Sequence, residues 1–167
     1  AAVTYAIERA YFSIQDWEDD RQGNLVYENR VEVGVCYPDG PFDGGDYQLA
    51  KIDGSVTDAE HFMWLTVAEE YRHSGVAGTG VVVDGENDSK YGIRIRDDYT
   101  RVEWLELKRF RRRHGAAAVE VKDAEHVWLA QLLIHDFFSD DYSVAGIKGS
   151  DDSDFTARNC IIYNGDK

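Results

Sequence analysis

The best candidates for acid–base chemistry in this chain are His135 and Asp136, which end one short apolar segment and begin a loop. An imidazole beside a carboxylate can act as a general base, with the carboxylate orienting the ring. Tyr163-Asn164 stands in the equivalent place one repeat later, so a polar corner that recurs for structural reasons explains the pair without catalysis. We therefore interpret His135-Asp136 as a turn, and the sequence leans away from an enzyme.

Two acidic loops form the candidate metal site. Ca²⁺ takes about six to eight oxygen ligands, so carboxylates that converge from neighbouring repeats could hold it. The candidate ligands are Asp140, Asp141, Asp151, Asp152 and Asp154. The spacing Asp-x-Asp-x-Asp-Gly is missing, and a solvated acidic face is the simpler interpretation of these residues. No cofactor is certain from the sequence, and Ca²⁺ is the one it suggests.

The one basic run of the chain comprises Lys108-Arg109 and residues 111–114. Guanidinium groups match carboxylate and sulfate geometry, so the run fits an acidic polysaccharide. It also fits an acidic loop on a neighbouring copy of the chain, which would set the register of an assembly. The second interpretation agrees better with the overall charge.

Length and charge limit the possible partners. The 167 residues suffice for one domain, and 18 Lys plus Arg against 32 Asp plus Glu give 18 − 32 = −14. That balance excludes nucleic acid as the expected partner, because a phosphate backbone needs a basic face. No apolar run reaches the roughly 20 residues of a membrane span. The start lacks a basic segment followed by an apolar stretch, so we expect any export signal to have been removed.

The elements that must position these residues come from internal repeats. The segment 92–95 returns at 118–121 and again at 146–149, and the segment 104–107 returns at 132–135 and 160–163. Each repeat reads as a short strand, a polar turn, a second strand and a variable loop. Short alternating strands that recur every ~27 residues without intervening helices indicate a parallel β-helix, an all-β solenoid.

Equivalent inward residues of such a solenoid should stack from turn to turn. The repeats predict three files of stacked side chains. They are Ile93 on Val119 on Ile147, Leu105 on Leu133 on Ile161, and Trp104 with Leu132 and Cys160. This placement makes Cys160 a core residue, and it favours two buried thiols at Cys36 and Cys160 over one long-range disulfide.

The first half of the chain continues the pattern less regularly. Candidate strands cover 30–37, 48–52, 62–68 and 80–84, and the only convincing helix is 13–21, with Ser13 as its N-cap. A terminal helix can cover the open end of a solenoid core. We expect a single domain over 1–167, with a cap region over 1–29 and repeats over 30–167.

Several segments resemble the secreted right-handed parallel β-helix repeat proteins of bacteria and phages. The resemblance lies in the segments 13–19, 35–37, 72–81, 97–105 and 159–164. It implies an extracellular or cell-surface location and a structural or polysaccharide-facing role. In polysaccharide lyases of this fold Ca²⁺ offsets the charge of the uronate while a Lys or Arg removes the proton. Arg158, Lys148 and Lys122 would be the available bases.

The last predicted strand leaves an apolar cross-section and a row of strand edges, which is a template for further pairing. Head-to-tail stacking of copies would cover it, and a chain that is a fragment explains it equally. The expected assembly residues are Cys160, Ile161, Ile162 and Tyr163 at this end and Ile14 and Trp17 at the other. We expect an extracellular structural or adhesive protein that self-assembles into a filament or surface layer. The alternative is a carbohydrate-active module that uses its acidic loops with Ca²⁺.

Overall fold

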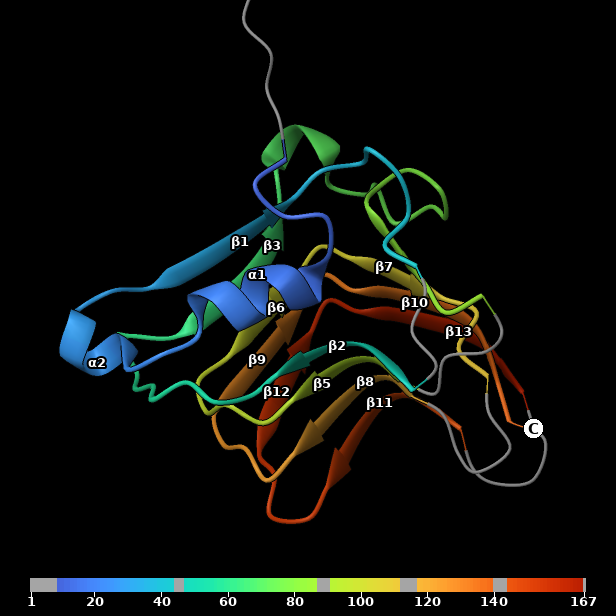
Figure 1. Ribbon diagram of the computed structural model, residues 1–167. Helices are drawn as coiled ribbons and strands as arrows, with labels where there is room; N and C mark the ends of the chain where they lie inside the picture. Colours follow the sequence, from blue (N-terminus) through green and yellow to red (C-terminus); the bar gives the residue numbers. More distant parts are fainter. Residues whose placement is uncertain (1–8, 44–46, 87–90, 112–116, 140–143, 167) are drawn as a thin grey trace, which may run out of the picture.

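The computed structural model describes residues 9–43, 47–86, 91–111, 117–139 and 144–166. Its chain forms an all-β parallel solenoid of about four turns, which confirms the predicted fold class. Each turn adds one strand to each of three parallel sheets. Figure 1 looks roughly along the solenoid axis, so the sheets form the sides of a triangle.

Sheet 1 has five strands, and sheets 2 and 3 have four each. Sheet 1 consists of β1 (Glu32–Cys36), β3 (Met63–Val67), β6 (Arg101–Glu103), β9 (Val127–Ala130) and β12 (Phe155–Arg158). Sheet 2 consists of β2 (Gln48–Ile52), β5 (Tyr91–Ile95), β8 (Ala117–Lys122) and β11 (Ala145–Ser150). Sheet 3 consists of β4 (Val82–Asp84), β7 (Glu106–Lys108), β10 (Leu133–Phe138) and β13 (Ile161–Asp166).

The prediction of two strands per repeat was wrong, because each turn contains a third. The unpredicted strands are β6, β9 and β12, which have three or four residues each. A strand this short shows little alternation of apolar and polar residues. Its pattern therefore does not stand out from the turns that flank it.

The predicted register is right in sheet 2. Ile93 pairs with Val119, and Val119 pairs with Ile147, so these residues stack in one file of the core. Parallel strands lie about 4.8 Å apart, which brings branched aliphatic side chains into direct contact from one turn to the next.

In sheet 3 the predicted pairing of Leu133 with Ile161 is confirmed, but the predicted partner of Leu133 in β7 is wrong by one residue. Leu133 aligns with Glu106 and not with Leu105, and the inward-facing file consists of Leu107, Ile134 and Ile162. The shift arises at the corner that precedes each strand of sheet 3. One residue at this corner has a positive φ in the left-handed region, and these residues occupy equivalent positions in successive turns. They are Trp104 (φ 64°), Gln131 (φ 49°) and Asn159 (φ 54°). Their spacings are 131 − 104 = 27 and 159 − 131 = 28 residues, whereas a constant 28 was predicted.

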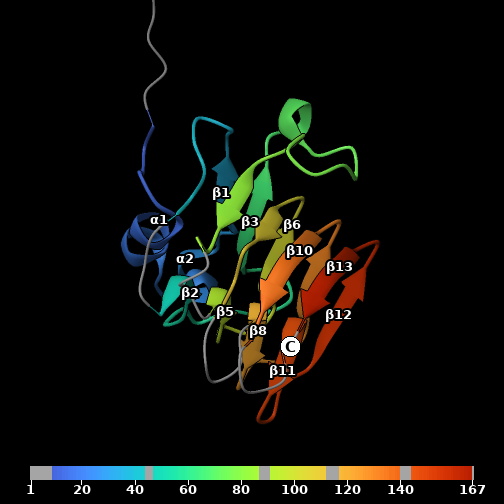
Figure 2. The same cartoon turned by 90° about the vertical axis from the view of Figure 1, so that its right-hand side faces the viewer.

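Helices lie at the N-terminal end of the solenoid (Figure 2). α1 spans Ile14–Arg21, and the Ser13 side chain accepts a hydrogen bond from the Asp16 N–H, as expected of its N-cap. The short α2 (Leu25–Glu28) and the 3₁₀ helix Glu69–Tyr71 are the other helical segments. Among the described residues, no helix has the length and apolar character needed to cross a membrane.

Candidate functional site

His135 lies in a polar cluster on the outer face of sheet 3. Its Nε2 is 3.1 Å from Oε1 of Glu106, and its Nδ1 is 2.8 Å from Oδ2 of Asp136. The Gly78 N–H donates to Oε2 of Glu106 at 2.6 Å, which covers that carboxylate with the loop before β4. The Tyr163 ring stacks on the imidazole at a centroid distance of 5.1 Å. The side chains of His135 and Glu106 are buried.

This geometry fits a structural role for the cluster. Both imidazole nitrogens face a carboxylate oxygen, so neither is available to take a proton from a substrate. The other oxygen of Asp136 accepts from the Asn164 side chain at 3.0 Å. These hydrogen bonds from His135 and Asn164 hold the pKa of Asp136 below its ordinary value. The cluster therefore links β7, β10 and β13 across three turns.

Arg158, the third catalytic candidate, lies on a different sheet from His135 and Asp136. It belongs to β12, and its guanidinium lies 5.0 Å from the centre of the Trp128 ring. The structure brings two of the three candidates together and separates the third. A lyase-like arrangement of these three residues is thus missing among the described residues.

Of the three candidate Ca²⁺ ligands that can be located, Asp151 and Asp154 have partners of their own, and Asp152 is exposed. Asp151 pairs with Lys122 at 2.6 Å, which lowers the pKa of the carboxyl, and Asp154 lies 3.6 Å from His126. Asp140 and Asp141 fall outside the described residues. Within the described ranges no three His, Cys, Asp or Glu side chains converge on a point where a metal ion could bind. The Ca²⁺ site stays a prediction.

Lys108 and Arg109 of the basic run pack against an acidic residue of the preceding turn. Arg109 donates two hydrogen bonds to Asp84, at 2.7 and 2.6 Å, and Lys108 lies 3.6 Å from the same carboxylate. Asp84 is 3% exposed. Burial alone would raise its pKa, but the bonds from Arg109 outweigh burial and lower it. Residues 112–114 of the run lie outside the described residues.

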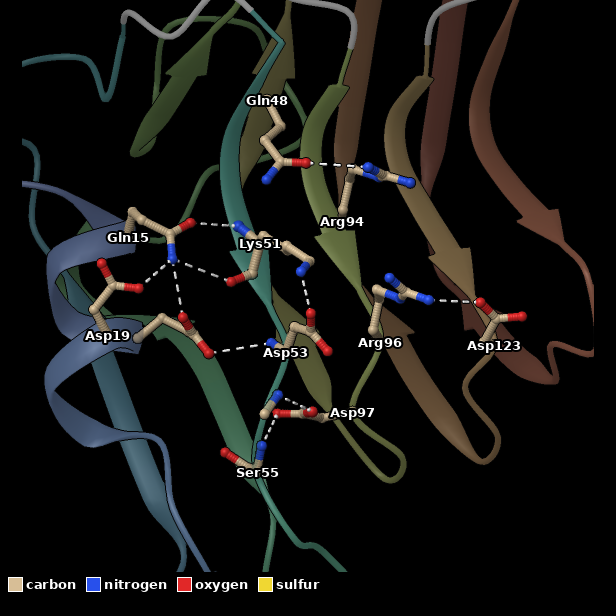
Figure 3. Close-up of polar contacts among 12 residues, drawn as sticks. Gln15, Asp19, Gln48, Lys51, Asp53, Ser55, Arg94, Arg96, Asp97 and Asp123 are labelled. Atoms are coloured by element: carbon tan, nitrogen blue, oxygen red, sulfur yellow. Dashed lines mark hydrogen bonds and ion pairs between the residues drawn. The ribbon is translucent and has the colours of Figure 1, made fainter.

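The outer face of sheet 2 carries a second network, which the sequence analysis missed. Buried Glu120 accepts from Arg94 at 2.7 Å and from Lys148 at 2.9 Å, so one carboxylate joins three successive turns. Burial acts to raise the pKa of Glu120, but these two cations lower it overall. Arg96 makes a similar link to Asp123 at 2.8 Å (Figure 3). The sequence did contain a signal for this network, because its oppositely charged partners are 26 to 28 residues apart.

Side chains of α1 close the N-terminal edge of sheet 2 (Figure 3). Oε1 of Gln15 accepts from the Lys51 N–H at 2.7 Å, and its Nε2 donates to the Lys51 carbonyl at 3.4 Å. Oε1 of Glu18 accepts from the Asp53 N–H at 3.1 Å. Polar side chains thus take the place of the missing strand, and they satisfy main-chain groups that an edge would otherwise expose.

The edge of β4 in sheet 3 and the inner face of β1 in sheet 1 are covered at the same end. Phe42 bridges to Val83, donating its N–H to the Val82 carbonyl at 2.9 Å and accepting from the Asp84 N–H at 2.8 Å. Trp17 packs against Gly34 of β1 so closely that a Cβ on this glycine would lie 2.7 Å from the indole ring. Ile14 and Trp17, predicted to form an assembly surface, are buried inside the chain (4% and 5% exposed). These two side chains therefore present no surface to which a second copy of the chain could bind.

The C-terminal end lacks any such cover in the described chain. β11, β12 and β13 are the last strands of their sheets, and no element lies beyond them in Figure 2. Ile134 is 0% exposed, whereas Ile162, one turn further along the same inward file, is 46% exposed. Of the expected assembly residues at this end, Ile161 and Tyr163 are similarly exposed and Cys160 is half-buried.

Both cysteines are free thiols, as favoured from the sequence, but only Cys36 is buried, whereas Cys160, which was expected in the core, is half-buried. Cys36 lines an open cleft of about 880 Å³ between the residues before α1 and strand β1. Burial raises the pKa of its thiol to about 12, so it is un-ionised at neutral pH and is a poor nucleophile. Burial also raises the pKa of Cys160.

Comparison of the chain with protein-family models, with curated proteins and with solved structures found no match. The candidate sites are therefore judged on geometry alone. The geometry provides two features on which a function can be based. The first is the pair of polar networks that join successive turns, and the second is the difference in cover between the N-terminal and C-terminal ends of the described solenoid.

Proposed function

We propose that this protein is a non-catalytic structural or adhesive β-solenoid of the secreted bacterial or phage type, which assembles through its C-terminal turn. The observation that carries the proposal is the contrast between the ends. At the first turn α1 and Phe42 cover the edges of β2 and β4, whereas the last turn exposes Ile162, an inward-facing core residue. Strand edges beside exposed apolar side chains favour pairing with another chain.

The polar networks support the non-catalytic part of this proposal. His135, Glu106 and Glu120 are satisfied by other side chains of the same solenoid. A catalytic acid or base needs a reachable group that can exchange a proton with substrate. An extracellular location agrees with the net charge of −14, which keeps a protein soluble and limits non-specific contacts.

The experiment is light scattering after size exclusion, with negative-stain electron microscopy of the same fractions, with and without a Ca²⁺ chelator. We expect assemblies larger than the 19.0 kDa chain. Loss of assembly on chelation would assign the acidic loops to the contact. Monomers at every concentration would overturn the proposal.

A matched pair of variants makes this test specific. Ile162→Lys places an amine at the exposed last turn, where it can reach water without unfolding the core. Val33→Lys places the same charge on β1 at the opposite end, where Val33 is 40% exposed. Ile162→Lys should abolish assembly, and Val33→Lys should leave it intact. Circular dichroism would verify that both variants fold.

Glycan binding is the second candidate, and one observation favours it. Trp64, Arg101 and Trp128 align in register across β3, β6 and β9 on the outer face of sheet 1. Indole rings pack on the apolar faces of sugars, and an Arg between them could bind a uronate or sulfate. A glycan array would test it, with Trp64→Ala as the variant that should lose any signal found.

A further inference from the structure

We infer that residues 72–80, the cover loop, are a pH-dependent cover over the outer face of sheet 3. The cover loop is closed while His135 is protonated and His73 is neutral, and it opens when either ring changes its charge. This device operates within a single chain, so it goes beyond the proposed assembly and does not depend on it.

The contacts of the cover loop place it over the starts of three strands of sheet 3. Its Gly78 N–H donates to Oε2 of Glu106 on β7, and a Cβ on Gly75 would lie 3.2 Å from Cδ1 of Ile161 on β13. Leu133 on β10 pairs with both Glu106 and Ile161, so the three side chains form one outward row. Leu133 is buried although it lies outside the core cluster, and we attribute this burial to the cover loop.

His135 holds one side of the cover loop through Glu106. Its two ring nitrogens lie 3.1 Å from a carboxylate oxygen of Glu106 and 2.8 Å from one of Asp136. An ionised carboxylate can only accept, so both contacts are satisfied only by the protonated ring, which donates from both nitrogens. Loss of this proton leaves a nitrogen lone pair facing a carboxylate oxygen. Because Gly78 binds the other oxygen of Glu106, movement of that carboxylate releases the loop.

The other titratable groups around His135 lie on three strands. Lys108 on β7 and Tyr163 on β13 flank it in register, and the Tyr163 ring stacks on the imidazole. Lysine and tyrosine side chains ordinarily titrate near about pH 10. The pKa of Asp136 is lowered, chiefly by the hydrogen bond from His135. The imidazole is therefore the group in this cluster whose type changes charge between about pH 5 and 8.

His73 holds the other side of the cover loop, and it must be neutral to do so. Its Nε2 lies 2.7 Å from the Gln131 carbonyl, which can only accept, so Nε2 carries the hydrogen. Its Nδ1 accepts from the Gly75 N–H at 3.2 Å. Protonation would point a second N–H at this donor and break the contact. The Trp104 ring and the Arg72 guanidinium, which lies over the same indole, are the aromatic and charged groups beside His73.

The two histidines therefore set opposite limits. At low pH both rings are protonated and His73 releases the loop, whereas at high pH both are neutral and His135 no longer holds Glu106. The cover loop is closed in the intermediate range, in which His73 has lost its proton and His135 has kept it. Opening uncovers the outward row of Glu106 and Leu133.

Hydrogen exchange of the full chain, corrected for intrinsic exchange rates and measured at about pH 5, 7 and 9, tests this device. We expect protection within residues 72–80 to be roughly tenfold lower at the two outer pH values, since each opening loses a hydrogen bond of the loop. Peptides from β8, which is paired on both sides, are the control and should keep their protection. Equal protection of the loop at all three pH values overturns the inference.

Two near-isosteric variants assign the two limits. Glu106→Gln keeps an acceptor for the Gly78 N–H and offers an amide N–H to neutral His135, so it should abolish only the opening at high pH. His73→Gln keeps a donor and an acceptor without titrating, so it should abolish only the opening at low pH. A variant that still opens at its own limit overturns the assignment of that histidine, and with it the inference.

Nuclear magnetic resonance with isotope-labelled histidine tests the charges without any substitution. At about pH 7 both ring nitrogens of His135 should carry hydrogen, and His73 should carry it on Nε2 alone. The chain has five histidines, so the spectrum is simple, and loss of one signal in His73→Gln identifies that ring. A neutral His135 or a charged His73 at this pH overturns the inference, even if Glu106→Gln fails to fold.

Discussion

Single carboxylates hold much of the polar structure of this protein, and their pKa values are shifted in opposite directions. Glu18 is the extreme case, because it is 1% exposed and burial raises its pKa from 4.5 to about 7. Asp84, Glu120 and Asp136 lie beside cations or hydrogen-bond donors, and their pKa values are lowered. Glu18 is therefore the carboxylate whose titration is expected near neutral pH.

Glu18 should make the protein less stable as pH rises from about 4.5 to 7. The folded state binds a proton in that window that the unfolded state has released, so the free energy of unfolding falls by up to about 1.4 kcal/mol per pH unit. Glu18→Gln retains an oxygen acceptor for the Asp53 N–H and has no charge to bury. Thermal melts should show that Glu18→Gln is the more stable protein at pH 7.5 and that its advantage disappears near pH 4.5. An advantage that is independent of pH would contradict the assignment.

Removal of the Glu120 carboxylate should leave two cations without their shared partner. Glu120→Ala is expected to lower the free energy of unfolding by about 3 kcal/mol, because one side of a buried ion pair is lost. Denaturant unfolding would measure the change. Asp123→Ala, which removes the exposed partner of Arg96, is the control and should cost less than about 1 kcal/mol. Equal losses for the two variants would show that burial is not the deciding factor.

At the scale of elements, α1 closes sheet 2 with side chains in place of a strand. Gln15→Ala removes both hydrogen bonds to Lys51 and should cost about 1–2 kcal/mol. Hydrogen exchange followed by mass spectrometry should show faster exchange in β2. Exchange in β8, which is paired on both sides, should stay unchanged. Uniform acceleration over the whole chain would instead mean that α1 is needed for global stability.

The close approach of α1 to β1 gives a second prediction for this element. Gly34→Ala places a methyl group 2.7 Å from the Trp17 ring, so the helix must shift. Overpacking of this kind usually costs about 1–3 kcal/mol. Fluorescence of Trp17 should report the displacement; because the chain has other tryptophans, the measurement needs a Trp17→Phe reference. An unchanged spectrum together with unchanged stability would contradict the packing described here.

Elements were predictable where a capping residue or flanking Gly- and Asp-rich turns mark their ends, and less so elsewhere. The strands β1 to β4 and the helix at 14–21 lie within the ranges expected from the sequence. The short strands of sheet 1 and the offset of 27 residues were missed, because a corner residue such as Trp104 has no local signal for positive φ. The contact of His135 with Glu106 depends on that offset. It could not be found until the register was known.

At the scale of the whole molecule, the two ends of one solenoid differ in chemistry. An assembly that forms only from folded chains stabilises them by mass action. The melting temperature should therefore rise with protein concentration, whereas that of Ile162→Lys should not change with concentration. Differential scanning calorimetry over a wide concentration range would measure both. A concentration-independent melting temperature for the unmodified chain would argue against self-association.

The cover of β2 and β4 by α1 and Phe42 gives the described solenoid a direction in which it loosens. Each turn contacts mainly its neighbours, so the solenoid behaves as a one-dimensional stack. A turn with a neighbour on one side only is the easiest to detach. In the unassembled chain, fluctuations should begin at β11, β12 and β13 and travel toward α1, which opens last. Pulling the chain by its ends in an optical trap should release it in steps of one turn, always starting from the same side.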